Sequence, residues 1–172
     1  MHVHVDGPVA QIALDLSGEP LFRRGHLRDG GPAPLKETLA ATILELADWP
    51  RLAAEGAALV DPMCGSGTFL SEGAGIALDH APGLNREFGF ERLPDHDPEA
   101  WRAMRATAEG RRRDVLHGPI LGADADGDQV ARARKNLGRA ELAPLIRVVR
   151  RSWDRLEPPP DVREAVPHGL VV

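Results

Sequence analysis

One stretch of the sequence, Asp61-Pro62-Met63-Cys64-Gly65-Ser66-Gly67-Thr68, has the composition of a ligand-binding turn. It follows the short apolar run 57–60 and precedes a mostly apolar or small stretch, 68–78, so it is predicted to join a buried strand to a helix. Glycine lets a backbone approach a ligand closely, and a helix N-terminus offers unpaired N–H groups to an anionic group. The turn therefore predicts a site for a ligand that carries a carboxylate.

Two common nucleotide-binding patterns do not describe this turn. No Lys follows the second Gly, as a triphosphate-binding loop requires, and the three spaced glycines of the dinucleotide fingerprint do not occur. A bare Gly-x-Gly is also a frequent structural turn that binds nothing. The flanking Asp-Pro and the run Cys-Gly-Ser-Gly-Thr favour a binding turn over that alternative.

A second acid is predicted at the same edge of the sheet. Ile120 and Leu121 open a short apolar strand that ends near Asp124. In open α/β sheets the ligand lies at the carboxyl ends of neighbouring strands, and an acid after the second strand commonly binds ribose hydroxyls. Asp124 suits that role, whereas Asp126 is expected to cap the following helix.

Other residues whose types could bind a metal or act as a nucleophile are not expected to do so. A calcium loop that began at Asp124 would place Gln129 and Lys135 where Gly and Glu are needed. Cys64 lies inside the turn, and no His stands at the spacing of a catalytic base. The pair His2 and His4 lacks a third ligand, so no metal site is predicted.

The surrounding elements predict an α/β fold. A β-hairpin is expected over residues 1–16, helices over 35–47, 68–78, 98–113 and 126–137, and strands over 57–60, 120–124, 145–149 and 169–172. This alternation indicates the N-terminal half of a Rossmann-like parallel sheet with helices on both faces. We expect a hairpin and linker over 1–31 and a partial Rossmann-like α/β domain over 32–172. The tryptophans are expected to pack in the core or in loops: Trp49, Trp101 and Trp153.

Composition and charge exclude several functional classes. The chain has 172 residues, 42% of them hydrophobic, which is enough for one core, and a single Cys excludes a disulfide framework. The net charge of −5 argues against a wholly basic nucleic-acid-binding protein. The Arg clusters at 23–28 and 111–113 are expected to be solvated surface. No apolar run is long enough for a membrane span and no secretory signal is visible, so we expect a cytoplasmic protein.

These residues carry a family resemblance. The turn from Asp61 to Leu70, preceded by Ala33-Pro34-Leu35-Lys36-Glu37-Thr38-Leu39-Ala40, resembles the THUMP-associated, S-adenosylmethionine-dependent RNA methyltransferases, in particular the bacterial 23S rRNA guanine-N2 enzymes. Leu14-Asp15-Leu16-Ser17-Gly18, Arg23-Arg24-Gly25 and the stretch 122–137 are similar to the same family. The resemblance implies a class I methyltransferase fold, S-adenosylmethionine as donor and ribosomal RNA as substrate of the full-length enzyme.

The resemblance also implies roles for individual residues. The amino-acid end of the donor would be held by Asp61, Pro62, Met63, Gly65, Ser66, Gly67 and Thr68, and bordered by Lys36, Glu37 and Thr38. Asp124 would bind the ribose hydroxyls, and Ala125 would pack against the adenine. Ser152 stands where the family has an acid near the adenine amine, which leaves Asp154 as the candidate there.

Two parts of the family pattern are expected to lie outside this chain. Amino-methyltransferases place Asn-Pro-Pro-Tyr after the fourth strand, where polar groups and an aromatic ring receive the target base. The sequence ends at Val172 before such a motif and contains no Tyr, and a THUMP domain would precede Met1. No catalytic residue is therefore assigned. The isolated chain is expected to bind the donor weakly or not at all and not to turn over.

Three interpretations remain open from the sequence. The chain is a piece of an RNA guanine-N2 methyltransferase, a fragment of a DNA amino-methyltransferase, or a non-catalytic module that binds a donor or a partner. The runs Leu14–Gly18 and Ala33–Glu37 favour the first over the second. An incomplete sheet leaves an edge strand unpaired, so association through that edge is also expected, and no membrane contact is.

Overall fold

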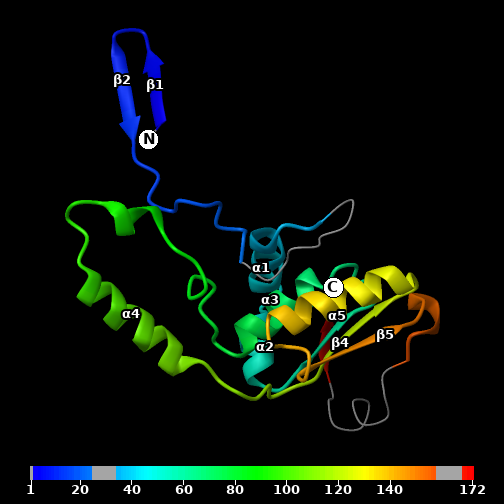
Figure 1. Ribbon diagram of the computed structural model, residues 1–172. Helices are drawn as coiled ribbons and strands as arrows, with labels where there is room; N and C mark the ends of the chain where they lie inside the picture. Colours follow the sequence, from blue (N-terminus) through cyan, green and yellow to red (C-terminus); the bar gives the residue numbers. More distant parts are fainter. Residues whose placement is uncertain (1, 25–33, 158–167) are drawn as a thin grey trace.

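A parallel sheet forms the centre of the body in the computed structural model, which describes residues 2–24, 34–157 and 168–172 (Figure 1). Its strands are β3 (Ala58–Asp61), β4 (Ile120–Asp124), β5 (Ile146–Arg150) and β6 (Gly169–Val171), in the order β5-β4-β3-β6. The register pairs Asp61 with Gly122 and Asp124 with Arg150. Asp61 and Asp124 therefore end two neighbouring strands at the same edge of the sheet.

Four helices pack together on one face of this sheet: α1 (Glu37–Leu46), α2 (Trp49–Ala54), α3 (Thr68–Ala77) and α5 (Gly127–Arg139). Alternate strand residues, such as Leu59, Ile120 and Val148, meet buried side chains of these helices in one core. The Trp49 Nε1 donates to the carbonyl of Gly73 at 2.8 Å, which fixes α2 to α3. The expected parallel α/β sheet is confirmed. The expectation of helices on both faces is not met in the described part of the chain, where the helices that pack against the sheet lie on one face.

The segment between α3 and β4 leaves the body and returns to it (Figure 1). It contains a 3₁₀ turn, η1 (Gly89–Arg92), and the helix α4 (Pro98–Arg111), which Asp97 caps by accepting from two backbone N–H groups. Trp101 of α4 meets Phe88 and Phe90 edge to face, with ring centroids 5.6 Å and 5.0 Å apart. This small aromatic cluster stabilises a segment that adds no strand to the sheet.

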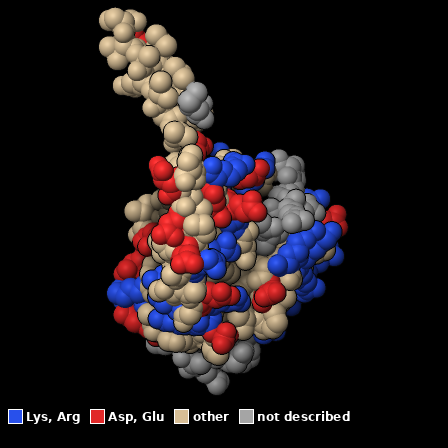
Figure 2. All heavy atoms as spheres, turned by 60° about the vertical axis from the view of Figure 1, so that its left-hand side comes forward, with Lys and Arg blue, Asp and Glu red and all other residues tan. Residues whose placement is uncertain are grey.

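The N-terminal hairpin projects from the body as a thin arm (Figure 1). Its strands are β1 (His2–Asp6) and β2 (Val9–Ala13), and Gly7 makes the turn at φ 54°. The cross-strand pairs Val3–Ile12 and Val5–Ala10 alternate with polar pairs, so the hairpin has one apolar face. All of its residues from 2 to 13 are nevertheless exposed, and Figure 2 shows an arm with almost no charged atoms.

Most of the predicted elements are present with boundaries shifted by a residue or two. The helix α2 is missing from the sequence-based expectation because six residues show no helical period, and Pro50 occupies the first turn, where no N–H is needed. Trp49 and Trp101 pack as predicted, whereas the prediction for Trp153 is wrong, since its side chain is 67% exposed. The expected loop at 157–167 and part of the connector 17–34 lie outside the described residues.

Candidate functional site

The turn after β3 has the backbone that its glycines predict. Gly65 and Gly67 adopt φ values of 52° and 87°, in the left-handed region that favours glycine. The Gly67 N–H donates to the Cys64 carbonyl at 2.8 Å and closes the turn. A Cβ on Gly67 would lie 3.3 Å from the Cβ of Ala133 in α5, whereas a Cβ on Gly65 would meet no atom within 4 Å. Gly67 thus serves packing, and Gly65 faces open space where a ligand can approach the backbone.

Three hydrogen bonds hold the turn against its neighbours. The Cys64 N–H donates to the carbonyl of Ala123 at 2.8 Å, and the Gly65 N–H donates to Oδ2 of Asp124 at 3.0 Å. From α5, the Nδ2 of Asn136 donates to the carbonyl of Ser66 at 3.1 Å. The turn is therefore fixed to both β4 and α5 before any ligand arrives, which lowers the conformational entropy that binding would cost.

Asp124 joins the turn to the end of β4. Its Oδ1 accepts from the N–H of Asp126 at 2.9 Å, while Oδ2 accepts from Gly65. An ionised carboxylate offers about four acceptor positions, so two remain for the hydroxyls of a ligand. Asp126 in turn accepts from the N–H of Asp128 at 2.8 Å and caps α5, as the sequence predicts.

Asp61 is the buried acid of the site. It is 4% exposed, and its Oδ1 accepts from the N–H of Met63 at 3.2 Å. Burial, helped by the nearby charge of Asp124, raises the pKa of Asp61 to about 6. Burial together with the two acids raises the pKa of the Cys64 thiol to about 12, so the thiol stays protonated and is a poor nucleophile.

Two hollows lie along this carboxyl edge. The first, about 240 Å³, borders the turn and is lined by residues from four segments. These are Pro34, Leu35, Asp61, Met63, Cys64, Gly65, Ser66, Thr68, Phe69 and Gln129. The second, about 380 Å³, lies beyond β4 and β5 and is lined by Ala125, Arg150, Arg151, Ser152, Asp154 and Arg155. Asp124 connects the two hollows. Its carboxylate accepts from the N–H of Gly65, which lines the first hollow, and the next residue in the sequence, Ala125, lines the second hollow.

The sequence-based site residues are distributed unevenly over this edge. Most of the turn, together with Ala125 and Asp154, lines the two hollows, whereas Pro62, Gly67 and Asp124 line neither of them. Lys36 lies elsewhere, with its Nζ 5.4 Å from the centroid of the Phe22 ring. Glu37 is buried beside Arg24, and burial raises its pKa. The carbonyl of Thr38 accepts from the hydroxyl of Thr42 within α1.

Several lining residues are missing from the sequence-based set. Leu35 stands one position before the predicted Lys36, and Phe69 one position after Thr68. Gln129 comes from the first turn of α5, directly after the acid-rich run 124–128. The rule that ligands lie at the carboxyl ends of strands indicates all three, because the loops and helix starts at that edge surround the site.

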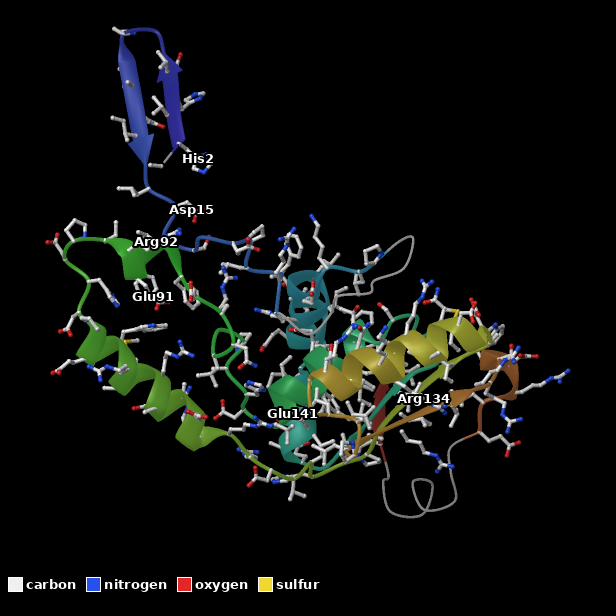
Figure 3. All side chains as sticks on the ribbon, viewed as in Figure 1. His2, Asp15, Glu91, Arg92, Arg134 and Glu141 are labelled. Carbon is white, nitrogen blue, oxygen red and sulfur yellow. The ribbon has the colours of Figure 1, made fainter. Side chains whose placement is uncertain are left out.

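A larger hollow of about 580 Å³ lies away from this edge. It is bordered by α1 and α3, including Glu72, and by residues that follow α3 and α5, including His80 and Glu141. Figure 3 places Glu141 past the end of α5 that is opposite the Asp126 cap. No strand ends there with an acid, and within the described ranges no cluster of three His, Cys, Asp or Glu residues could hold a metal. The carboxyl edge is therefore the better candidate.

A parallel sheet of this order, with a glycine turn after one strand and an acid after the next, defines the class of Rossmann-like methyltransferases. The model of the RMKL-like methyltransferase domain matches residues 24–166. The chain therefore belongs to the family of RMKL-like methyltransferase domains.

Curated relatives cover the whole chain. The Ribosomal RNA large subunit methyltransferase K/L of Stutzerimonas stutzeri is 44% identical over 176 residues, and that of Methylococcus capsulatus is 47% identical over 175 residues. Both alignments span 100% of this chain but only 24% and 23% of the relatives. The chain thus has about a quarter of their length.

Two solved structures share the fold at lower sequence identity than these curated relatives. SMU.472, described as a methyltransferase complexed with SAH, gives a TM-score of 0.75 at 35% identity and covers 84% of this chain and 36% of its own. A protein of Listeria monocytogenes, named as an N6-adenine-specific DNA methylase, gives 0.76 at 32% identity over 91% of this chain and 39% of its own. None of the described helices is long and apolar enough to cross a membrane.

Proposed function

We propose that the carboxyl edge binds S-adenosylmethionine and that the chain is the donor-binding part of a methyltransferase acting on guanine N2 of large-subunit ribosomal RNA. The observation that carries the proposal is the bond from the Gly65 N–H to Asp124, which connects the hollow beside the turn to the hollow beside Ala125. The family and the named function of its relatives support the same conclusion. The substrate is a cytoplasmic RNA, so the protein is proposed to act in the cytoplasm.

The residues of the edge match the parts of this donor. Gly65 has open space on its Cβ side, so its backbone can approach the amino-acid end. The free acceptor positions of Asp124 suit the two ribose hydroxyls, since vicinal hydroxyls pair well with a carboxylate. Ala125 and Asp154 line the second hollow, where an adenine would lie with its amine toward Asp154. Lys36, Glu37 and Thr38 remain proposed neighbours of the amino-acid end.

When bound, the donor supplies a sulfonium methyl group that an amine nitrogen attacks in line, forming an N–C bond, breaking the C–S bond and releasing a proton and a neutral thioether. The chain's own residues contribute position. The turn between Asp61 and Thr68 fixes one end of the donor and Asp124 fixes its middle, so the methyl carbon is held at one place above the edge. Such fixation supplies much of the rate in a bimolecular transfer.

The donor site is tested by Asp124→Asn. An amide keeps one acceptor but turns an NH₂ group toward the N–H of Gly65 or Asp126, so we expect donor affinity to fall about tenfold to a hundredfold. The matched control is Asp126→Asn, which keeps the helix cap because Asn caps as well as Asp, and should change affinity by less than about twofold. Ligand-observed NMR with the donor measures both, even at weak affinity.

Two results would count against the donor site. Equal affinity in the wild type and Asp124→Asn would exclude Asp124 as the ribose ligand. Absence of any donor signal from the wild type, with the fold intact by circular dichroism, would contradict the proposal as a whole.

The substrate class has one supported alternative, because the Listeria neighbour is named as a DNA methylase. A binding competition separates the two. A labelled stem-loop from 23S rRNA should be displaced by the same unlabelled RNA at lower concentration than by a DNA duplex of the same sequence. Displacement at lower concentration by the DNA would favour the alternative.

A further inference from the structure

The basic residues of this acidic protein are concentrated in one segment. Residues 129–156 hold eight of the 21 Lys and Arg and only two of the 26 Asp and Glu, Glu141 and Asp154. The eight are Arg132, Arg134, Lys135, Arg139, Arg147, Arg150, Arg151 and Arg155. This segment comprises most of α5, the whole of β5 and the start of the following loop. It is therefore strongly positive although the chain as a whole is negative.

The fold brings residues from these elements to one surface. We define the α5–β5 basic surface as Arg134, Lys135, Arg150 and Arg151, all of which are exposed. The Nη2 of Arg134 donates to the carbonyl of Val148, so Arg134 spans from α5 to β5, and Figure 3 shows it between the two elements. The guanidinium of Arg150 lies about 3.5 Å from the position of a Cβ on Gly127, at the start of α5.

The charges of this surface are not neutralised by acids. Within the parts of the chain that the structure describes, none of these four cations forms an ion pair. Arg134 and Arg150 instead donate to the backbone carbonyls of Val148 and Ala125, which leaves their positive charge uncompensated. In Figure 2, Lys and Arg gather on the right-hand side of the body, whereas both signs mix over its middle. Such a surface attracts a polyanion.

An exposed aromatic ring and the nearby donor edge favour RNA as that polyanion. Trp153, in the 3₁₀ turn η2 (Trp153–Arg155), is 67% exposed and comes directly after Arg150 and Arg151 in the chain. Cations beside an exposed ring are typical of proteins that hold single-stranded bases, because the ring stacks on a base while the cations contact phosphates. Arg150 and Arg151 also line the second hollow, so the basic surface extends to the proposed donor site at the carboxyl edge.

We propose that the α5–β5 basic surface binds the phosphate backbone of the RNA substrate and that Trp153 stacks on an unpaired base beside it. The proposal rests on the proposed function and adds the path of the RNA across the domain. Arg24 does not belong to this surface: the expectation that it is solvated is wrong, because it forms a largely buried ion pair with Glu72 and is not available to phosphates.

The test uses the full chain and a fluorescein-labelled RNA stem-loop, with anisotropy measured at several salt concentrations. The triple variant Arg134→Gln, Lys135→Gln, Arg151→Gln should weaken binding by about tenfold and reduce the salt slope of log K by about 2, because each lost phosphate contact removes about 0.7–0.9 from it. The control on α4 and the residues just after it, Arg102→Gln with Arg111→Gln and Arg113→Gln, changes the net charge equally and should alter affinity by less than about twofold.

A second variant tests the stacking. Trp153→Ala should weaken binding of the stem-loop about fivefold or more and leave a fully paired RNA duplex unaffected, because only an unpaired base can stack on the ring. A structural role of Trp153 would weaken both RNAs equally and would overturn this part of the proposal.

Other outcomes overturn the surface itself. These are no RNA binding by the wild type, equal losses in the α5–β5 and α4 triple variants, or equally tight binding of poly-glutamate, which would indicate an acidic protein partner. Donor binding, measured by NMR on the same samples, separates the two proposals. A wild type that binds RNA with the predicted slope but no donor would contradict the proposed function, whereas donor binding without RNA binding would contradict the surface.

Discussion

Asp61 shows how a single residue is set for its role by its surroundings. It ends β3 at the bottom of the first hollow, almost fully buried, and the charge of Asp124 lies close by. Both effects disfavour the carboxylate and raise the pKa of Asp61 to about 6. A ligand that carries an ammonium group would reverse this balance by stabilising the ionised form.

This residue therefore predicts a pH dependence of donor binding. The donor carries an ammonium and a sulfonium, so it binds better when Asp61 is ionised, and affinity should rise about tenfold between pH 5 and pH 7 as a group with pKa about 6 loses its proton. The profile is measured by ligand-observed NMR over this range. Asp61→Asn should flatten it, and a profile that stays equally steep in that variant would assign the titration to another group.

At the scale of elements, the strand–turn–helix unit of β3 and α3 depends on glycines with different tasks. Gly67→Ala would force a left-handed residue and push a methyl group to 3.3 Å from Ala133, so the free energy of unfolding should fall by about 1–2 kcal/mol. Gly75→Ala, within α3 and free of neighbours, should raise it by about 0.5–1 kcal/mol. Urea titration measures both. A stabilised Gly67→Ala would contradict the described turn.

The connector before α1 is held to α3 by a buried ion pair. Nε and Nη2 of Arg24 each donate to one oxygen of the Glu72 carboxylate at 3.2 Å, and the two side chains are 13% and 9% exposed. Burial raises the pKa of Glu72 although Arg24 opposes the shift, so desolvation offsets much of the attraction.

Removing one partner of this ion pair should lower the free energy of unfolding more than replacing both partners with apolar residues. Glu72→Gln leaves the Arg24 charge buried without its main partner and should lower the free energy of unfolding by about 3 kcal/mol. The double variant Arg24→Met, Glu72→Leu removes both charges and should lie within about 1 kcal/mol of the wild type. Urea unfolding of the two variants checks the pair, and a double variant as unstable as Glu72→Gln would show that the charges themselves stabilise the protein.

The sequence predicts a helix or strand best where the residues that identify it all lie within that one element. The apolar run before Asp61, the small residues of α3 and the spacing of Val130, Ala133 and Leu137 each identify an element and its buried face. Predictions that depend on two elements were less complete. Leu35 and Gln129 reach the hollow only because the start of α1 and the start of α5 flank the same turn. The basic surface was missed because Arg134 reaches β5 only when α5 packs on that strand.

At the scale of the whole molecule, two strand surfaces leave apolar side chains exposed. The hairpin presents Val3, Val5 and Ile12 to solvent on one face. At the end of the described sheet, β6 pairs with β3 alone, and Val171 is 67% exposed. An edge strand with free N–H and C=O groups is a template for pairing with another chain.

The β6 edge therefore predicts self-association. The sedimentation coefficient of the chain should rise with concentration, and Val171→Lys should reduce the rise, because a charge on an edge strand opposes pairing. Val115→Lys is the matched control, since Val115 is 68% exposed but lies outside any strand. A chain that is monomeric at all concentrations, or an equal effect of both lysines, would contradict association through this edge.

The central claim is that a methyl donor lies along the carboxyl edge, from the turn at Gly65, past Asp124, to Ala125. A crystal structure of the chain with S-adenosylhomocysteine tests it most directly. The predicted result is the amino-acid end against the turn, the ribose hydroxyls within hydrogen-bond distance of Asp124 and the adenine beside Ala125. Density for the ligand in the larger hollow beside Glu72 and His80, with none at Gly65 or Asp124, would contradict the account.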